Sequence, residues 1–141
     1  MPHLRLAKKL GLKTVLTIHY PLPICQRTTL MLNGQQACDG KIDPVRCSYC
    51  ADNLTKNLPA PMVKLLAAIP MSVISRVKLP ESAYIASSSH NGSLGGIVRP
   101  FVVPAFVAAR LHGLLEMAQV ADRIIAVCDW LYEALLINGI P

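Results

Sequence analysis

The chain has 141 residues, 52% of them hydrophobic and only 16% charged, and it carries a formal net charge of +6. That length suits one domain and that charge suits anionic partners, but two Phe, one Trp and four Tyr offer little surface for base stacking, which disfavours nucleic acid. Neither a secretory signal nor a membrane-spanning segment is predicted, because the apolar runs are shorter than about 20 residues and proline interrupts them. The composition therefore predicts a cytoplasmic protein with an anionic partner.

The first elements predicted are a helix and a strand. Residues 2–10 form a short basic pattern that Gly11 ends, as glycine often ends a helix. Residues 13–19 are rich in β-branched side chains and lack clear alternation, which is typical of a buried parallel strand. Pro21 follows the strand closely and ends it. A helix, a glycine and a buried strand together predict half of a doubly wound α/β unit.

The middle of the chain contains fewer regular patterns. Residues 20–61 read as a loop that holds four of the five cysteines together with several turn-forming pairs. A short helix is predicted at 62–69, and a mobile or ligand-binding segment is predicted at 81–96, which is rich in Ser and Gly. The longest helix is predicted at 105–120, after the interruption at Pro104.

The last segment predicts a second buried strand within residues 121–127, followed by a helix that Cys128 or Asp129 caps. The pair Asn138-Gly139 ends that helix. Two strands about a hundred residues apart do not fill a sheet, and no Gly-rich turn follows the first strand, as a doubly wound domain normally requires. The sequence therefore predicts an incomplete Rossmann-like α/β domain across 1–141, with the cysteine-containing loop 20–61 inside it.

Two blocks of sequence carry a family resemblance. They are Thr14-Val15-Leu16-Thr17-Ile18-His19 with the cysteine-bearing stretches 23–25, 38–40 and 47–50, and Ala121-Asp122-Arg123-Ile124-Ile125-Ala126-Val127 with the helix that ends at 138–141. In order and spacing these blocks resemble the acceptor-binding, N-terminal half of a family-four glycosyltransferase of the GT-B fold.

The resemblance implies two Rossmann-like halves with the active site between them and no catalytic metal. It also implies transfer of a sugar from a nucleotide-sugar donor to a glycan or lipid-linked acceptor, as in polysaccharide biosynthesis. The donor-binding half has no counterpart in the sequence, so we expect a truncated enzyme that is inactive alone and needs that half or a partner chain. The chain also departs from the family pattern at Tyr20, Pro21 and Leu22, which replace an Asp and an aromatic pair, and at Cys128, which replaces a serine.

His19 is the catalytic candidate that the resemblance implies. It follows the first strand, and open α/β sheets bind ligands at the carboxyl ends of their strands. A histidine there can position the acceptor or stabilise charge on the transferred sugar. From residue chemistry alone, a histidine that is merely satisfied in a loop or core is the competing interpretation.

The cysteines at 25–50 follow the pattern C-x12-C-x8-C-x2-C. Four thiolates, two of them with two residues between them, can hold a structural zinc ion or cluster. Unligated thiols and a pair of disulfides are the alternatives, and a reducing cytosol disfavours the disulfides. The candidate metal ligands are Cys25, Cys38, Cys47 and Cys50. A zinc-stapled binding or membrane-surface module without catalysis is therefore the alternative function.

A membrane surface is the remaining partner considered. Lys64, Arg76 and Lys78 flank apolar residues and suit an anionic surface, which would place the protein at the inner face of the membrane. A core-packed pair of helices with exposed lysines explains the same pattern.

Overall fold

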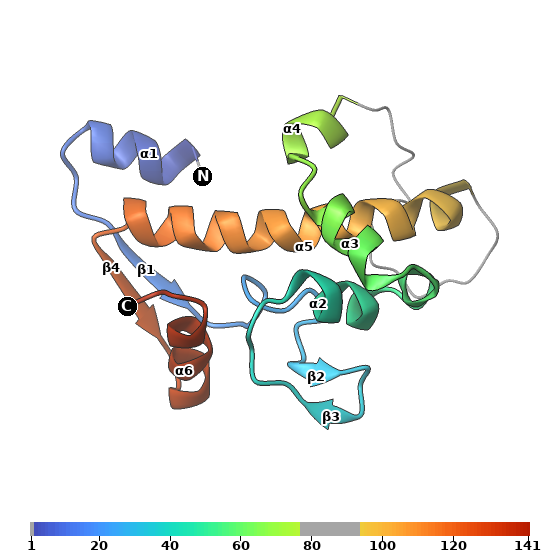
Figure 1. Ribbon diagram of the computed structural model, residues 1–141. Coiled ribbons are helices and arrows are strands. Elements are labelled where there is room, and N and C mark those ends of the chain that lie inside the picture. Colours follow the sequence, from blue (N-terminus) through green and yellow to red (C-terminus); the bar gives the residue numbers. More distant parts are fainter. Residues whose placement is uncertain (1, 77–93) are drawn as a thin grey trace. The chain divides into compact units, whose positions relative to one another are not determined.

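The computed structural model describes residues 2–76 and 94–141. The chain divides into two compact units, one formed by Met1–Ile42 with Arg110–Pro141 and the other by Asp43–Ala109. Helices and a small parallel sheet make the structure mixed α/β (Figure 1). The elements in chain order are α1 (Pro2–Lys9), β1 (Val15–Ile18), β2 (Met31–Leu32), β3 (Gln36–Ala37), α2 (Pro44–Ala51), η1 (Leu54–Asn57), α3 (Ala60–Ala67), α4 (Met71–Ile74), α5 (Leu94–Val120), β4 (Arg123–Ala126) and α6 (Asp129–Ile137).

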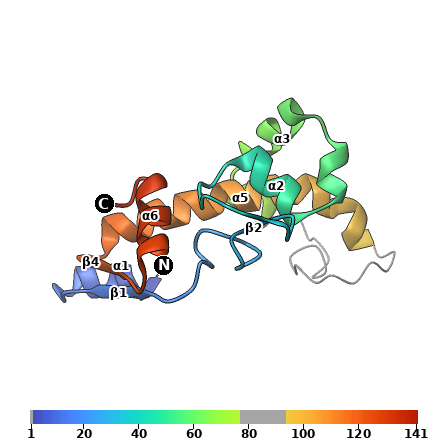
Figure 2. The ribbon, with the colours of Figure 1, turned by 90° about the horizontal axis from the view of Figure 1, so that it is seen from below.

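The first unit is organised around β1 and β4, which lie side by side and run parallel (Figure 2). Val15 pairs with Arg123 at one end and Ile18 with Ala126 at the other. The two predicted strands are therefore present, but the prediction that they are buried on both faces is wrong. Only Ile18 is fully buried in β1, and exposed residues alternate with half-buried ones along β4. The described residues leave one face of the sheet exposed. Burial therefore alternates from residue to residue, as it does in a strand with one buried face.

Helix α6 follows β4 and contributes to the apolar core of this unit. It begins after Cys128, as predicted, although the thiol makes no capping hydrogen bond. Leu131, Ala134 and Leu135 are buried. Trp130, the neighbour of Leu131 in the same helix, is 49% exposed. The buried face thus follows the spacing i, i+3 and i+4 from Leu131.

The second unit is helical in the described residues. Ile74 on α4 packs with Val102 and Ala105 on α5, and Ile69, Met71, Val98 and Phe106 surround this cluster. A polar cluster closes the end of α2: one carboxylate oxygen of Asp52 accepts hydrogen bonds from the backbone and hydroxyl of Thr55. The other oxygen lies 3.5 Å from Nε of Arg99. These contacts satisfy an acidic side chain that is only 8% exposed.

Helix α5 begins about a turn and a half before Pro100, so the prediction of a helix that starts only after Pro104 is wrong. Both prolines lie inside the helix, and each removes one backbone hydrogen bond. Pro104 is fully buried, as are its neighbours Val103 and Ala105, and this packing offsets the local cost. Within the described residues, Val98–Val120 is long and apolar enough to cross a membrane by length and composition alone. A core helix of a soluble protein passes the same test.

The segment 20–61 contains more structure than the predicted loop. Strands β2 and β3 form a short antiparallel hairpin whose turn contains Asn33 and Gly34. Helix α2 and the short helix η1 follow. Asp43 caps α2 by accepting a hydrogen bond from the backbone of Arg46. The predicted mobile or binding segment at 81–96 lies almost wholly outside the described residues.

Candidate functional site

The carboxyl edge of the β1–β4 sheet carries the residues that the sequence singled out. Because Ile18 is in register with Ala126, the residues that follow them leave the sheet at the same edge. His19 and Tyr20 follow β1 and are both exposed, while Cys128 follows β4 at the start of α6. The edge thus combines an imidazole with the partial positive charge of a helix N-terminus, and both groups suit an anionic or hydroxyl-rich ligand.

The chain after His19 is held by two features. The backbone N–H groups of Ile24 and Cys25 donate to the carbonyl of Pro21, at 2.8 and 2.6 Å, which closes a tight turn. Arg110 on α5 donates to the carbonyl oxygen of Leu22. Ile24 is 3% exposed and anchors the turn in the core. A turn fixed at both the backbone and the side-chain level gives His19 a defined place beside the sheet.

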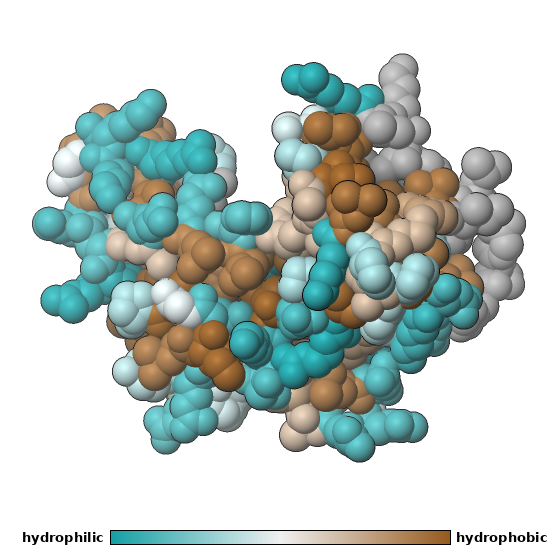
Figure 3. All heavy atoms as spheres, viewed as in Figure 1, coloured by the Kyte–Doolittle hydropathy of each residue, from teal (hydrophilic) through white to brown (hydrophobic). Residues whose placement is uncertain are grey.

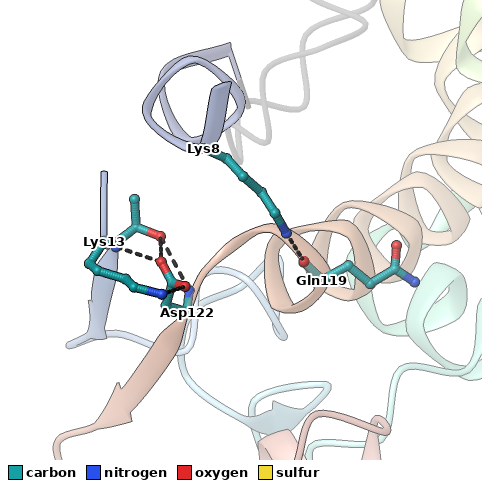
Figure 4. A network of polar contacts seen from close by, with 5 residues as sticks. Lys8, Lys13, Gln119 and Asp122 are labelled. Carbon is teal, nitrogen blue, oxygen red and sulfur yellow. Dashed lines mark hydrogen bonds and ion pairs between the residues drawn. The ribbon is translucent and has the colours of Figure 1, made fainter. Parts of the chain in front are cut away.

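Asp122 connects the two strands at the opposite end of the sheet. Its carboxylate accepts hydrogen bonds from the backbone N–H of Thr14 at 2.8 Å and from the Thr14 hydroxyl at 3.2 Å. Lys13 approaches the second carboxylate oxygen at 3.4 Å (Figure 4). The backbone hydrogen bond from Thr14 is the main reason that the pKa of Asp122 lies below its usual value, and Lys13 adds to the effect. This contact sets the register of β1 against β4.

A second connection links α6 to the chain before α2. The side-chain oxygen of Asn138 accepts from the backbone N–H of Ile42 at 2.8 Å. Its amide nitrogen donates to the carbonyls of Gly40 and Ala134, at 2.8 and 2.7 Å. Gly40 lies so close to α6 that a Cβ there would be 2.6 Å from Cβ of Ala134, and its φ of +79° favours glycine. The segment after Cys38 is therefore fixed by a buried polar contact.

The predicted metal ligands fall into two pairs. Cys25 and Cys38 belong to the first unit, whereas Cys47 and Cys50 lie one turn apart on α2 in the second. None of the four forms a disulfide, and all are of intermediate exposure. Within the described residues, no group of three or more His, Cys, Asp or Glu side chains is arranged to hold a metal ion. The C-x2-C pair is helical rather than a tight knuckle, and zinc remains a prediction.

Sequence reasoning missed the polar groups that hold these segments in place. Asn138 was interpreted only as part of a helix stop, and its own hydrogen bonds were not anticipated. Asp122 directly precedes β4, and Thr14 directly precedes β1, the strand that pairs with it. An aspartate and a threonine in these two positions give a weak signal for a hydrogen bond between them. Arg110, within the predicted helix 105–120, donates to the loop after β1, a contact that the helical pattern does not reveal.

Comparison with protein-family models, with curated proteins and with solved structures finds no match for this chain.

Proposed function

We propose that this chain is the acceptor-binding part of a glycosyltransferase that moves a sugar from a nucleotide-sugar donor to a glycan or lipid-linked acceptor. The proposal includes a Rossmann-like arrangement in which β1 and β4 are two strands of a larger parallel sheet. It also includes a donor-binding half, supplied by further chain or by a partner, without which the chain does not catalyse transfer.

The observation that carries the proposal is the parallel pairing of β1 and β4 with His19 at their carboxyl edge. The two sequence blocks that resemble the glycosyltransferase family are the ones that pair, although about a hundred residues separate them. His19 is exposed there and free to meet a substrate. Parallel sheets place their ligand sites at this edge, which supports a role for His19 in positioning the acceptor or stabilising charge.

The uncovered face of the sheet supports the need for a partner. Val15 on β1 is 61% exposed and Ile125 on β4 is 48% exposed. The register places both side chains on the same face, because Val15 is opposite Arg123 and Thr17 is opposite Ile125. Parallel sheets are normally covered on both faces. A covering layer from the remainder of an α/β enzyme would bury these side chains.

The test begins with the native polypeptide isolated from its host, whose size reports whether a second α/β half accompanies this chain. That polypeptide and the 141-residue chain are each incubated with radiolabelled UDP-glucose, UDP-N-acetylglucosamine or GDP-mannose, and with host membrane extract as the acceptor source. We expect the native polypeptide to transfer label from one donor and the 141-residue chain alone to transfer none. Absence of transfer by the native polypeptide from all donors tested would count against glycosyl transfer.

His19 is tested in the same assay. His19→Ala should lower the transfer rate by roughly a hundredfold or more, the usual contribution of a positioned acid–base group. His112→Ala is the matched control, because His112 is also exposed but lies on α5. Equal rates for the two variants would remove His19 from the active site while leaving the glycosyltransferase proposal open to other residues.

A further inference from the structure

Helix α1 has an outward face that combines leucine and lysine. Leu6 and Leu10 are one turn apart, and they are 55% and 65% exposed. Lys9 lies next to them on the helix surface, and α1 has no buried residue. Figure 3 shows hydrophobic and hydrophilic residues next to each other over α1. Leu6 on α1 and Leu10, the residue directly after the helix, form an apolar strip that the described part of the unit does not cover.

Contacts with α5 determine which side of α1 faces outward. Nε of Arg5 donates to the carboxylate of Glu116 at 2.8 Å. Nζ of Lys8 donates to the backbone oxygen of Gln119 at 3.0 Å (Figure 4). Both acceptors lie in the last turns of α5, within the same compact unit. These contacts occupy one side of the helix, so the strip of Leu6 and Leu10 is directed away from α5.

The charge around this strip is positive. No acidic residue precedes Asp39 in the sequence, and α1 ends with Lys8 and Lys9. Arg5 is neutralised by Glu116, whereas Lys9 makes no hydrogen bond or ion pair with any residue that the structure describes. Lys8 bonds to a neutral carbonyl and retains its charge, but it lies on the side of α1 that faces α5. The cationic side chain of Lys9 beside the exposed leucines complements an anionic interface that has an apolar layer beneath it.

We propose that the outward face of α1 docks on the surface of an anionic phospholipid bilayer. Leu6 and Leu10 enter the boundary between headgroups and acyl chains, while Lys9 contacts the lipid phosphates. This surface differs from the one suggested by the sequence around Lys64, and it does not depend on the glycosyltransferase proposal.

A phospholipid surface fits these residues better than RNA does. RNA-binding surfaces interleave basic and aromatic side chains, and the sequence has no Phe, Trp or Tyr before Tyr20. Exposed leucines add nothing to phosphate binding in RNA, but they contribute directly to lipid binding.

The experiment measures co-sedimentation of the 141-residue chain with vesicles of phosphatidylglycerol and phosphatidylcholine, or of phosphatidylcholine alone. We expect binding to the anionic vesicles and little binding to the neutral ones. Leu10→Ser should weaken the partition coefficient roughly tenfold, because a leucine side chain leaves the apolar layer. Lys9→Glu should weaken it roughly fivefold or more. Both residues are exposed, so circular dichroism should show an unchanged fold.

Two control variants lie on α3, where Lys64 and Leu65 are also exposed neighbours. Leu65 is 71% exposed, close to the value for Leu10, so Leu65→Ser removes a similar apolar side chain. Lys64→Glu makes the same charge change as Lys9→Glu. Vesicle binding should survive both control substitutions.

The proposal is overturned if the chain stays in the supernatant with anionic vesicles, or if the α3 variants weaken binding as much as the α1 variants. It is also overturned if the wild type binds no vesicles and analytical ultracentrifugation shows that it self-associates, with Leu10→Ser converting it into a monomer. Finally, binding to a single-stranded RNA that needs Lys9 but not Leu10, without vesicle binding, would assign the surface to nucleic acid.

Discussion

Replacing Asn138 with alanine should destabilise the first unit strongly, because one small side chain makes three hydrogen bonds there. The partners are the backbone groups of Ile42, Gly40 and Ala134, at 2.7–2.8 Å. Asn138 is only 9% exposed, so water cannot easily replace the lost amide. The net contribution of one hydrogen bond to stability is about 0.5–1.5 kcal/mol, so the loss of three gives a total of roughly 2–4 kcal/mol for Asn138→Ala.

Urea denaturation followed by the fluorescence of Trp130 would measure this loss. Trp130 is the single tryptophan of the chain, and it lies on α6 in the same unit as Asn138. With a slope of about 2 kcal/mol per molar urea, the midpoint should fall by about 1–2 M. Asn138→Asp should also destabilise at neutral pH. A carboxylate there still accepts from Ile42, but its second oxygen faces the carbonyls of Gly40 and Ala134.

The matched control is Asn53→Ala. Asn53 is exposed and makes no side-chain capping bond at the start of η1, so its replacement should change stability by less than about 0.5 kcal/mol. If Asn138→Ala shifted the midpoint no more than this control, the buried contact would not stabilise the unit and the reasoning would be refuted.

Three further predictions concern stability, pH and metal. Gly40→Ala should lower the free energy of unfolding by about 2 kcal/mol or more, since the residue has a positive φ and a new Cβ would meet Ala134; a midpoint equal to the wild type in the same urea titration would contradict this. The lowered pKa of Asp122 stabilises the fold above the usual carboxyl pKa of 3.8, and this contribution disappears as the pH falls through the lower folded-state value. Thermal unfolding between pH 5 and pH 2 should therefore show a steeper acid loss for the wild type than for Asp122→Asn, and parallel curves would show that the carboxylate is not responsible. If the four cysteines bind zinc, elemental analysis should find one zinc ion per chain, and Cys128→Ser should retain it. A metal-free wild-type protein would contradict the prediction. Zinc should be lost on serine substitution at any of the predicted ligands, Cys25, Cys38, Cys47 and Cys50.

The sequence was informative where local pattern and packing agree. Short β-branched runs marked both strands, and Cys128 followed by an apolar stripe marked the start of α6. These elements are determined by neighbours within a few residues. Their parallel pairing is consistent with the predicted α/β class, because the strands are far apart in sequence and helices lie between them.

Local rules failed where distant contacts outweigh them. Pro104 normally ends a helix, yet it lies inside α5, where its ring is fully buried. The apolar run of β4 indicated burial on both faces, but periodicity cannot say whether a covering layer is present. Asn138 was a helix stop by pattern, but two of its three side-chain hydrogen bonds are made with a loop almost a hundred residues away. Long-range partners of this kind leave no signature in a single sequence.

The uncovered sheet connects the fold to the proposed function. Two parallel strands with one exposed face bury little apolar surface, so hydrogen bonds between β1 and β4 need support from elsewhere. Asp122 provides part of that support at the amino end, and the packing of Ile18 provides part at the carboxyl end. Between these points Ile125 remains half exposed. The most favourable way to bury it is an added layer on that face, and the same layer would form a wall beside the edge where His19 is exposed. A partner that stabilises the sheet would therefore also shape the proposed acceptor site, and this links the stability of the chain to its proposed activity.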